Sequence, residues 1–343
     1  MSMTVVNILP EEDSRHFVEE HPQSNIFHTP EMFQVFERVQ GHQPTLWAVV
    51  DGHNCPLALL LPVQVTVMDG LLRAFTTRAV AYGSALCVPG PEGKEALAML
   101  LRTYQGETRR STLFTELRNL SDLSDVQPVL NECGFAYEKH LNFLIDLDRP
   151  EEAIWRKISR SGQQSVRTSH NKGTIIEEVT ERERVKIAYQ LLQKVYARVH
   201  VPLAGLTLFE AAFDLLAPQG MFKILMARIN EHYIGTCLLL MYNQRVIFWY
   251  GGSDRAFSSH YPMESLMWRT FQLSKEHGFR IFDFGGAGKP EEDYGPRKFK
   301  AKFGGTLVNY GRNICVHAPL AFSISKRAYA LMRRFSSMRW ATK

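Results

Sequence analysis

Alternating apolar and polar positions divide the chain into two similar series of elements. Residues 45–61 predict an apolar strand, a polar turn at Asp51–Asn54 and a second apolar strand. Residues 223–239 repeat this hairpin 178 positions later, with the turn at Asn230–His232. Because half a chain length separates the two hairpins, we predict a duplicated domain.

The elements around the second hairpin are the more clearly marked. The predicted order is helix, helix, three-stranded meander, helix and strand. Thr207 and Glu210 have the spacing of a capping box, which predicts the start of the second helix. Pro262 suits the first turn of the third helix, and Gly278 suits its end. The other predicted segments are a helix at Glu183–Val199, a strand at Arg245–Tyr250, a helix ending at His277 and a strand at Phe279–Phe284.

The first half predicts a comparable set of elements. They are a helix at Pro30–Gln40, strands near 44–87, a helix near Glu92–Tyr104 and strands at Ser111–Leu117 and His140–Leu147. Residues 148–152 resemble a linker. We therefore expect an α/β (α+β) fold of two tandem domains, 1–147 and 148–318, each with a mixed, mostly antiparallel sheet flanked by helices.

Composition narrows the class of protein. The 343 residues are 45% hydrophobic and 22% charged, as in ordinary globular proteins. No apolar stretch reaches the ~20 residues that span a bilayer, and residues 1–10 lack signal-peptide features. The five scattered cysteines form no CxxC pair or zinc-like cluster. We expect a cytoplasmic protein without structural disulfides or a metal site.

Positive charge is concentrated at the C-terminal end. Eleven Lys/Arg and no Asp/Glu lie from Gly295 onward, whereas the first 294 residues hold 29 basic and 35 acidic side chains. Residues 319–340 predict one helix with an apolar side and a basic side. This helix either packs on the rest of the protein with its basic face in solvent, or lies on an anionic membrane surface. In the second case the protein is peripheral at the inner face of the membrane.

The most informative stretch is residues 281–305. A strand ends in Gly285-Gly286, a polar loop follows, and alternation from residue 298 predicts a second strand with Lys298, Lys300 and Lys302 on one face. These cations suit either a solvated edge strand or a phosphate or developing oxyanion. Asp283 either acts as a base or orders the turn.

A second group of candidate residues is basic. Residues 153–174 carry five Lys/Arg and no acidic residue, and Arg160, Arg167 and Lys172 are the candidate phosphate ligands. A solvated helix face is the alternative. Tyr250, in Trp249-Tyr250-Gly251-Gly252-Ser253, fits a core aromatic with a hydrogen-bonded hydroxyl.

Phe282-Asp283-Phe284-Gly285-Gly286, followed by Phe299-Lys300-Ala301-Lys302-Phe303-Gly304-Gly305, resembles the closing signature of FemAB-type proteins. That group contains aminoacyl-tRNA-dependent ligases of peptidoglycan cross-bridges and GNAT-like relatives. The resemblance implies two GNAT-like domains and a C-terminal helix, 319–343, that returns to the first domain. It also implies that Phe299 and Lys300 lie at the acyl-transfer centre, that basic side chains grip a phosphate-bearing acceptor, and that Tyr250 lines the acceptor channel.

The acyl donor is harder to assign. GNAT domains that use acetyl-CoA hold its pyrophosphate on a Gly-rich loop, but this chain has residues 255–262, Arg-Ala-Phe-Ser-Ser-His-Tyr-Pro, at that place. We expect an acyl or aminoacyl transferase that forms an amide on an amine of a phosphate- or lipid-linked cell-envelope precursor, with no bound cofactor, and the donor is either aminoacyl-tRNA or an acyl carrier. The alternatives are an acyl-CoA or carrier-thioester N-acyltransferase and a non-catalytic scaffold that binds anionic lipid or nucleic acid.

Overall fold

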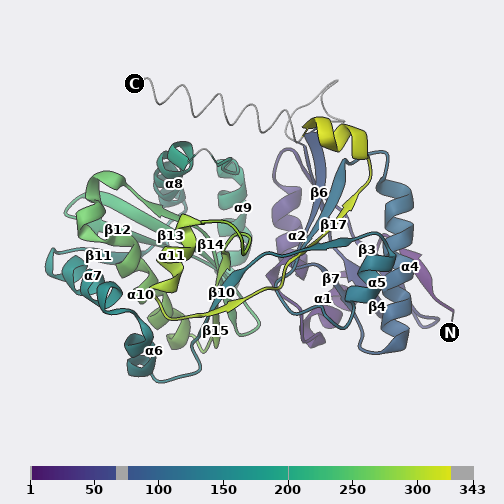
Figure 1. Cartoon of the computed structure of the whole chain (residues 1–343), viewed down its shortest axis with the longest axis horizontal. Helices are drawn as coiled ribbons and strands as arrows, with labels where there is room; N and C mark the ends of the chain where they lie inside the picture. Colours follow the sequence, from purple (N-terminus) through teal and green to yellow (C-terminus); the bar gives the residue numbers. More distant parts are fainter. Residues whose placement is uncertain (1, 67–75, 200, 326–343) are drawn as a thin grey trace. The chain divides into compact units, whose positions relative to one another are not determined.

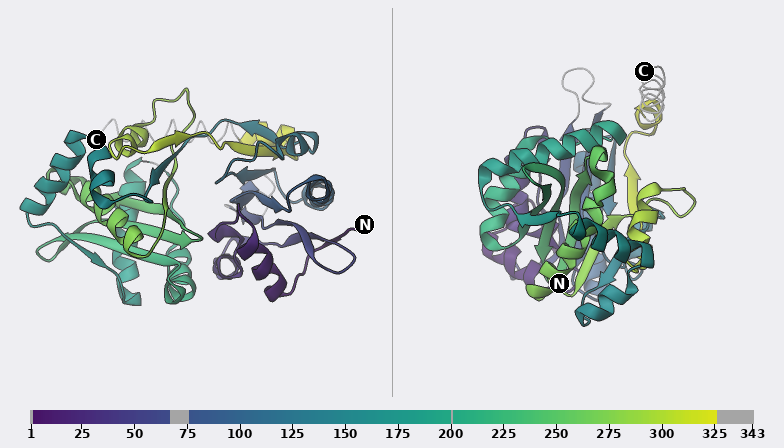
Figure 2. Two further views of the ribbon diagram at one scale, coloured as in Figure 1. Left: turned by 90° about the horizontal axis from the view of Figure 1, so that it is seen from below. Right: turned by 90° about the vertical axis from the view of Figure 1, so that its left-hand side faces the viewer.

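The computed structural model describes residues 2–66, 76–199 and 201–325, and the chain forms two compact units (Figure 1). Unit 1 comprises Met1–Lys139 and Tyr310–Lys343, and unit 2 comprises His140–Asn309. Unit 2 is therefore inserted into unit 1. The yellow-green segment that carries the chain back into the purple and blue unit can be followed in Figures 1 and 2.

The described residues of unit 1 form two sheets, with strand orders β1-β3-β4-β7 and β2-β5-β6-β8-β17-β9. The pairs are antiparallel except for β6 with β8. The strands are β1 (Thr4–Val6), β2 (His42–Pro44), β3 (Trp47–Val50), β4 (Pro56–Leu60), β5 (Val63–Thr66), β6 (Thr77–Tyr82), β7 (Ala85–Cys87), β8 (Phe114–Arg118), β9 (Ala136–Glu138) and β17 (Arg312–Val316). The helices are α1 (Glu11–Glu20), η1 (Ile26–His28), α2 (Pro30–Glu37), α4 (Pro91–Thr108) and α5 (Gln127–Glu132).

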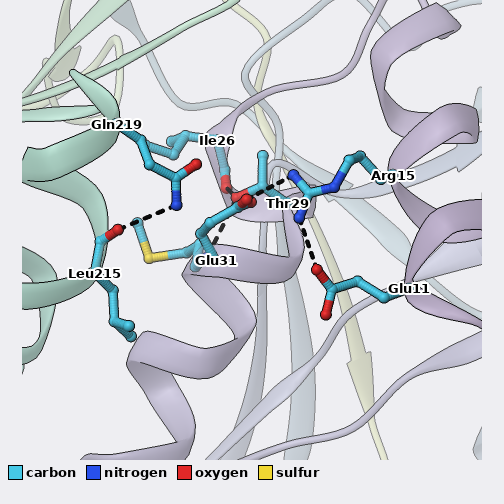
Figure 3. Close-up of polar contacts among 8 residues, drawn as sticks. Glu11, Arg15, Ile26, Thr29, Glu31, Leu215 and Gln219 are labelled. Atoms are coloured by element: carbon cyan, nitrogen blue, oxygen red, sulfur yellow. Dashed lines mark hydrogen bonds and ion pairs between the residues drawn. The ribbon is translucent and has the colours of Figure 1, made fainter.

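Polar contacts fix the first helices of unit 1 (Figure 3). The Arg15 guanidinium of α1 binds the Glu11 carboxylate at 2.7 Å and the Glu31 carboxylate of α2 at 2.5 Å. Thr29 caps α2, since its Oγ1 accepts from the Met32 N–H at 3.2 Å and donates to the Ile26 carbonyl at 2.8 Å. Ion pairs and the capping hydrogen bond thus connect α1, η1 and α2, in addition to their apolar contacts.

Unit 2 has one seven-stranded sheet, with strand order β11-β12-β13-β14-β15-β10-β16. Among the described strands of this sheet, only β14 and β15 pair in parallel. The strands are β10 (Asn142–Asp146), β11 (Ile175–Glu178), β12 (Phe222–Ile229), β13 (His232–Tyr242), β14 (Arg245–Ser253), β15 (Ile281–Gly286) and β16 (Thr306–Val308). The helices are α6 (Glu151–Lys157), α7 (Arg160–Asn171), η3 (Arg182–Arg184), α8 (Val185–Val199), α9 (Leu206–Leu216), η4 (Ala217–Gln219), η5 (Arg255–His260), α10 (Pro262–Glu276) and α11 (Gly295–Ala301).

Both predicted hairpins are present, as β3–β4 and β12–β13. The predicted order of unit 2 is also confirmed, from α8 and α9 through β12–β14 to α10 and β15. Pro262 opens α10, and Gly278 follows its end at φ +79°. The predicted α/β fold with mixed, mostly antiparallel sheets is therefore confirmed.

The units divide the chain differently from the predicted segments. β10, expected in the first domain, pairs with β15 and β16 of unit 2. β17, expected in the second domain, pairs with β8 and β9 of unit 1. A strand's pattern does not reveal its partner, because pairing depends on contacts far away in the sequence. The helix that begins at Pro319 contacts unit 1 through Phe322, which lies 5.1 Å from Phe114 between ring centroids. Most of the predicted helix lies outside the described residues.

The predicted capping box of α9 is wrong. The helix begins at Leu206, and its N-cap residue, Gly205, makes no side-chain capping bond. Glu210 instead lies 3.7 Å from the Arg182 guanidinium. Among the described residues, no helix is long and apolar enough to cross a membrane.

Candidate active site

The candidate site begins where the two parallel strands of unit 2 separate. β14 and β15 pair at three positions, and the last pair joins Ile247 to Asp283. β14 then continues to Ser253 along β13, with Trp249 as an extra residue in a β-bulge. β15 ends in Gly285 and Gly286. The strand ends therefore form a fork, the kind of place where backbone groups become available to a ligand.

Lys300 holds the glycine end of β15. Its ammonium donates to the carbonyl oxygens of Phe284 and Gly286, each at 2.7 Å, and of Gly285 at 3.4 Å. Only 8% of Lys300 is exposed. Burial lowers the pKa of this ammonium to about 8, and the Asp283 charge partly offsets that effect. Lys300 thus supports the fork by binding the main chain of β15, with the three N–H groups of its ammonium directed at protein carbonyls.

The predicted strand at 298–303 is wrong, because these residues belong to helix α11 and the turn after it. Phe299 and Phe303, four residues apart, meet edge to face at 5.3 Å between ring centroids. Phe303 belongs to the core of unit 2, and Phe299 packs against that core. Helical spacing separates the three lysines. Lys298 is exposed and pairs with Asp293 at 3.0 Å, whereas Lys302 pairs with Glu264 at 3.1 Å.

Asp283 is fully buried beside the fork. Its Oδ1 accepts from the Gly285 N–H at 2.7 Å and from Asn142 Nδ2 at 3.3 Å. Its Oδ2 lies 3.6 Å from the Arg245 guanidinium. Burial raises the pKa of this carboxyl, with Arg245 and Lys300 opposing the shift. The Gly285 bond is the turn-ordering contact that the sequence offered as one alternative for Asp283.

The basic candidates lie along α7. Arg160 begins the helix and is exposed. The preceding residue, Ser159, donates its N–H to the Lys302 carbonyl at 2.7 Å. Arg167 is also exposed and lies over the Trp155 ring, 5.6 Å from its centroid. Lys172, at the other end of α7, donates to the Ser259 carbonyl at 2.9 Å. The three side chains are therefore spread along one helix and do not converge on one point. Of the three, Arg160 lies beside α11.

Tyr250 lies on the arm of the fork formed by β14. Its ring contacts Phe209 at 4.9 Å and Tyr196 at 5.8 Å between centroids. Burial and the nearby Tyr294 raise the pKa of Tyr196 to about 12. Tyr250 is half-buried, so both of its predicted roles, channel wall and core aromatic, fit its position.

Two residues that the sequence did not single out are close to Lys300. Arg245, at the start of β14, faces Asp283. Arg297, one turn before Lys300 on α11, donates from Nε to the Ala287 carbonyl at 2.8 Å and from Nη1 to the Pro290 carbonyl at 3.2 Å. Its Nη2 donates to the Lys289 carbonyl. If residues 297–300 are taken as a helix, Arg297 and Lys300 fall on one side of it. That pattern would have indicated Arg297.

The segment between β14 and α10 uses its own backbone donors. Asp254 Oδ1 accepts from the Ala256 N–H at 3.0 Å, and the Asp254 carbonyl accepts from the Phe257 N–H at 3.1 Å. The Tyr261 N–H donates to the Ser258 carbonyl at 3.1 Å. Pro262 has no N–H to offer. These bonds reduce the number of amides that this segment can turn toward a pyrophosphate.

Comparison with known families defines the class. Residues 155–300, most of unit 2, match the family model described as an acetyltransferase (GNAT) domain. Unit 2 is thus a GNAT-type acyltransferase domain. A search of curated protein sequences gave no significant match.

The whole chain shares its fold with FemX and with a tandem GNAT protein. The FemX crystal structure matches with a TM-score of 0.73 at 15% identity, covering 95% of this chain and all of that one. A tandem GNAT protein from the clavulanic acid biosynthesis pathway has a TM-score of 0.57 at 12% identity, covering 92% and 99%. The C-terminal domain of a putative lysylphosphatidylglycerol synthetase from Agrobacterium fabrum has a TM-score of 0.54 at 14% identity, covering 92% and 93%.

Proposed function

We propose that the protein is an aminoacyl- or acyltransferase that forms an amide on an amine of a phosphate- or lipid-linked cell-envelope precursor. The observation that carries this proposal is the likeness to FemX over nearly the full length of both chains. The fork of unit 2 supports it, because Lys300 holds the end of β15 there in a fixed geometry. The putative lysylphosphatidylglycerol synthetase is a second similar protein whose named product combines an amino acid with a lipid phosphate.

The proposed reaction places the acceptor amine at the fork. The amine nitrogen attacks the acyl carbon, the carbonyl electron pair moves to oxygen, and collapse of the intermediate expels the donor's alcohol or thiol. The proton leaves the nitrogen and reaches the expelled group, so neither an oxidant nor a metal is needed. Lys300 contributes positive charge beside this centre, and Phe299 packs under it. Asp283 positions the turn and supports the charge of Lys300.

The acceptor's phosphate is assigned to the basic side chains. Arg160 and Arg167 are exposed on α7 and can each bind phosphate with two N–H groups. Lys172 and Lys302 add charge at either end, and Tyr250 lines the amine's approach. An acceptor in a lipid headgroup layer would bring this face to an anionic membrane surface, and the same charges would favour it.

A second candidate is an N-acyltransferase that uses acyl-CoA or an acyl carrier thioester. The match of residues 155–300 to an acetyltransferase (GNAT) family favours it. The internally bonded segment at Asp254–Pro262 favours aminoacyl-tRNA as the donor instead, since a CoA pyrophosphate needs several free amides.

The test is transfer by the purified protein from two donors, aminoacyl-tRNA and acetyl-CoA. The acceptor is a lipid-linked muropeptide, which carries the amine, and mass spectrometry detects the acylated product. Phosphatidylglycerol vesicles, which have no amine, measure binding to anionic lipid. Product from aminoacyl-tRNA on an amine acceptor supports the proposal, and product from acetyl-CoA supports the second candidate. Binding to the vesicles without product from either donor would support a non-catalytic scaffold and contradict the proposed function.

A further inference from the structure

The segment that follows β15 is held on two sides. The Ala287 N–H donates to the Leu141 carbonyl at 2.6 Å, and the Leu141 N–H donates to the Gly288 carbonyl at 2.9 Å. From the other side, Arg297 Nε donates to the Ala287 carbonyl at 2.8 Å. The peptide between Ala287 and Gly288 is therefore fixed in orientation by bonds on both of its neighbours.

This fixed peptide aims one N–H group. In a trans peptide the carbonyl and the following N–H point in opposite directions. Because the Ala287 carbonyl points to Arg297, the Gly288 N–H points away from α11. Gly288 is buried, and within the described part of the chain its N–H donates to no acceptor. Buried amides without a partner are rare in proteins, so this one requires an explanation.

Glycine is needed at this position. Gly288 has a φ of +76°, and a Cβ there would lie 3.0 Å from Cγ of the Tyr294 ring. Both the positive φ and the close ring therefore make a side chain at this position strained. The chain thus places a rigid, side-chain-free donor two residues beyond the Gly286 carbonyl that Lys300 binds.

We propose that the Gly288 N–H is a donor to the carbonyl oxygen of the acyl group, and that Arg297 is its positioning residue. This inference rests on the proposed acyl transfer. When the amine nitrogen bonds to the acyl carbon, the carbonyl electron pair moves to oxygen, and the Gly288 N–H donates to that oxyanion. When the C–N bond is complete, the pair returns as the donor's alcohol or thiol leaves.

The Lys300 ammonium and the Gly288 amide have different roles at this site. The Lys300 ammonium has three N–H donors, and three protein carbonyls lie within its reach. It therefore supplies charge and holds the backbone, whereas the Gly288 amide supplies a direct hydrogen bond. A preorganised backbone donor of this kind contributes about 10²- to 10³-fold in rate.

The direct test follows the Gly288 amide by NMR. The probe is an aminophosphonate ester of adenosine, a stable analogue of the tetrahedral intermediate from an aminoacyl ester. The expected result on the deuterated full chain is a downfield shift of the Gly288 amide proton and slower exchange with solvent. A Gly288 signal that does not respond to the probe overturns the inference, whether or not other amides move.

Kinetics test the role of Arg297. In Arg297→Met the Ala287 carbonyl loses its partner, and kcat is expected to fall about 10²-fold with little change in KM. Arg297→Lys can still reach one carbonyl and should recover part of kcat. Lys298→Met, on the exposed side of α11, is the matched control and should behave as wild type.

These outcomes separate this inference from the proposed function. Wild-type turnover with unchanged kcat in Arg297→Met contradicts the positioning role and leaves the transferase assignment standing. Absence of wild-type turnover with every donor contradicts the proposed function itself. An equal loss in Arg297→Met and Arg297→Lys, together with a lower melting temperature in both, would show a purely structural role and overturn the inference.

Discussion

The two units contain the same kind of parallel strand pair, but only one of them opens. In unit 1, β6 and β8 pair at four positions up to Tyr82 and Arg118, and the Gly83 N–H then donates to the Arg118 carbonyl at 2.9 Å. In unit 2, β14 and β15 pair at three positions and separate after Ile247. One unit closes its strand ends on itself, whereas the other leaves them as a fork.

Charges reinforce the difference. At the end of β8, the buried Glu116 carboxylate lies 2.9 Å from Arg118 and 2.5 Å from Arg312, and Arg118 also lies over the Tyr82 ring. These arginines bind a protein carboxylate. In unit 2, Arg297 and Lys300 of α11 bind main-chain carbonyls at and just after the end of β15. Under the proposed function, unit 1 uses the end of its parallel strand pair for stability, whereas unit 2 uses the end of its pair as a site.

The strongest test of the comparison removes Lys300. Lys300→Met should lower the transfer rate by about 10²- to 10³-fold, because the fork loses its charge and the Phe284 and Gly286 carbonyls lose their partner. Steady-state kinetics on folded protein measure it. Lys298→Met is the control with the same change on the exposed side of α11. Wild-type rates in Lys300→Met would contradict any role of Lys300 at the site.

The corresponding change in unit 1 should affect stability instead. Glu116→Gln leaves Arg118 and Arg312 without their carboxylate, at a cost of about 3 kcal/mol in the free energy of unfolding. Although burial opposes ionisation, the two arginines lower the pKa of Glu116 to about 2. The stabilisation is therefore complete above the ordinary carboxyl pKa of 4.5 and is lost as pH falls toward 2.

Urea unfolding of Glu116→Gln at neutral pH measures this cost, with the exposed Glu12→Gln as control. The transfer rate per folded molecule should stay at the wild-type value. A large loss of rate in stable, folded Glu116→Gln would contradict the division of roles between the two units.

A third prediction concerns the acceptor. Arg160→Ala should raise KM for a phosphate-bearing acceptor about tenfold and leave kcat nearly unchanged, because it removes ground-state binding. The effect should shrink as salt increases. Lys186→Ala on the exposed face of α8 is the control. An unchanged KM would show that Arg160 belongs only to a solvated helix face.

The smallest expected effect is a shift in the pH profile. With the pKa of Lys300 near 8, the transfer rate should fall as pH rises through that value. Asp283→Asn removes a charge that raises this pKa, so the alkaline limb should move to lower pH. Asp293 pairs with the exposed Lys298, so Asp293→Asn should not move the alkaline limb. Equal profiles for all three proteins would contradict the coupling of Asp283 to Lys300.

The sequence predicted unit 2 well where elements follow one another closely. The β12–β14 meander and α10 were found because local periodicity, polar turns, Pro262 and Gly278 mark them directly. The strand predicted at residue 298 failed because Lys-Phe-Lys-Ala-Lys-Phe also fits a helix with Phe299 and Phe303 on one side. Gly288 and Arg297 escaped notice because a backbone orientation depends on distant partners such as Leu141.

The place of β17 determines when unit 1 can be completed. In its sheet β17 lies between β8 and β9, and both neighbours belong to the first 139 residues. The ribosome makes β17 only after all of unit 2 has been synthesised. Because domains fold as units during synthesis, β9 must wait for a partner while unit 2, a continuous segment, can fold. The part of the chain made first is therefore finished last.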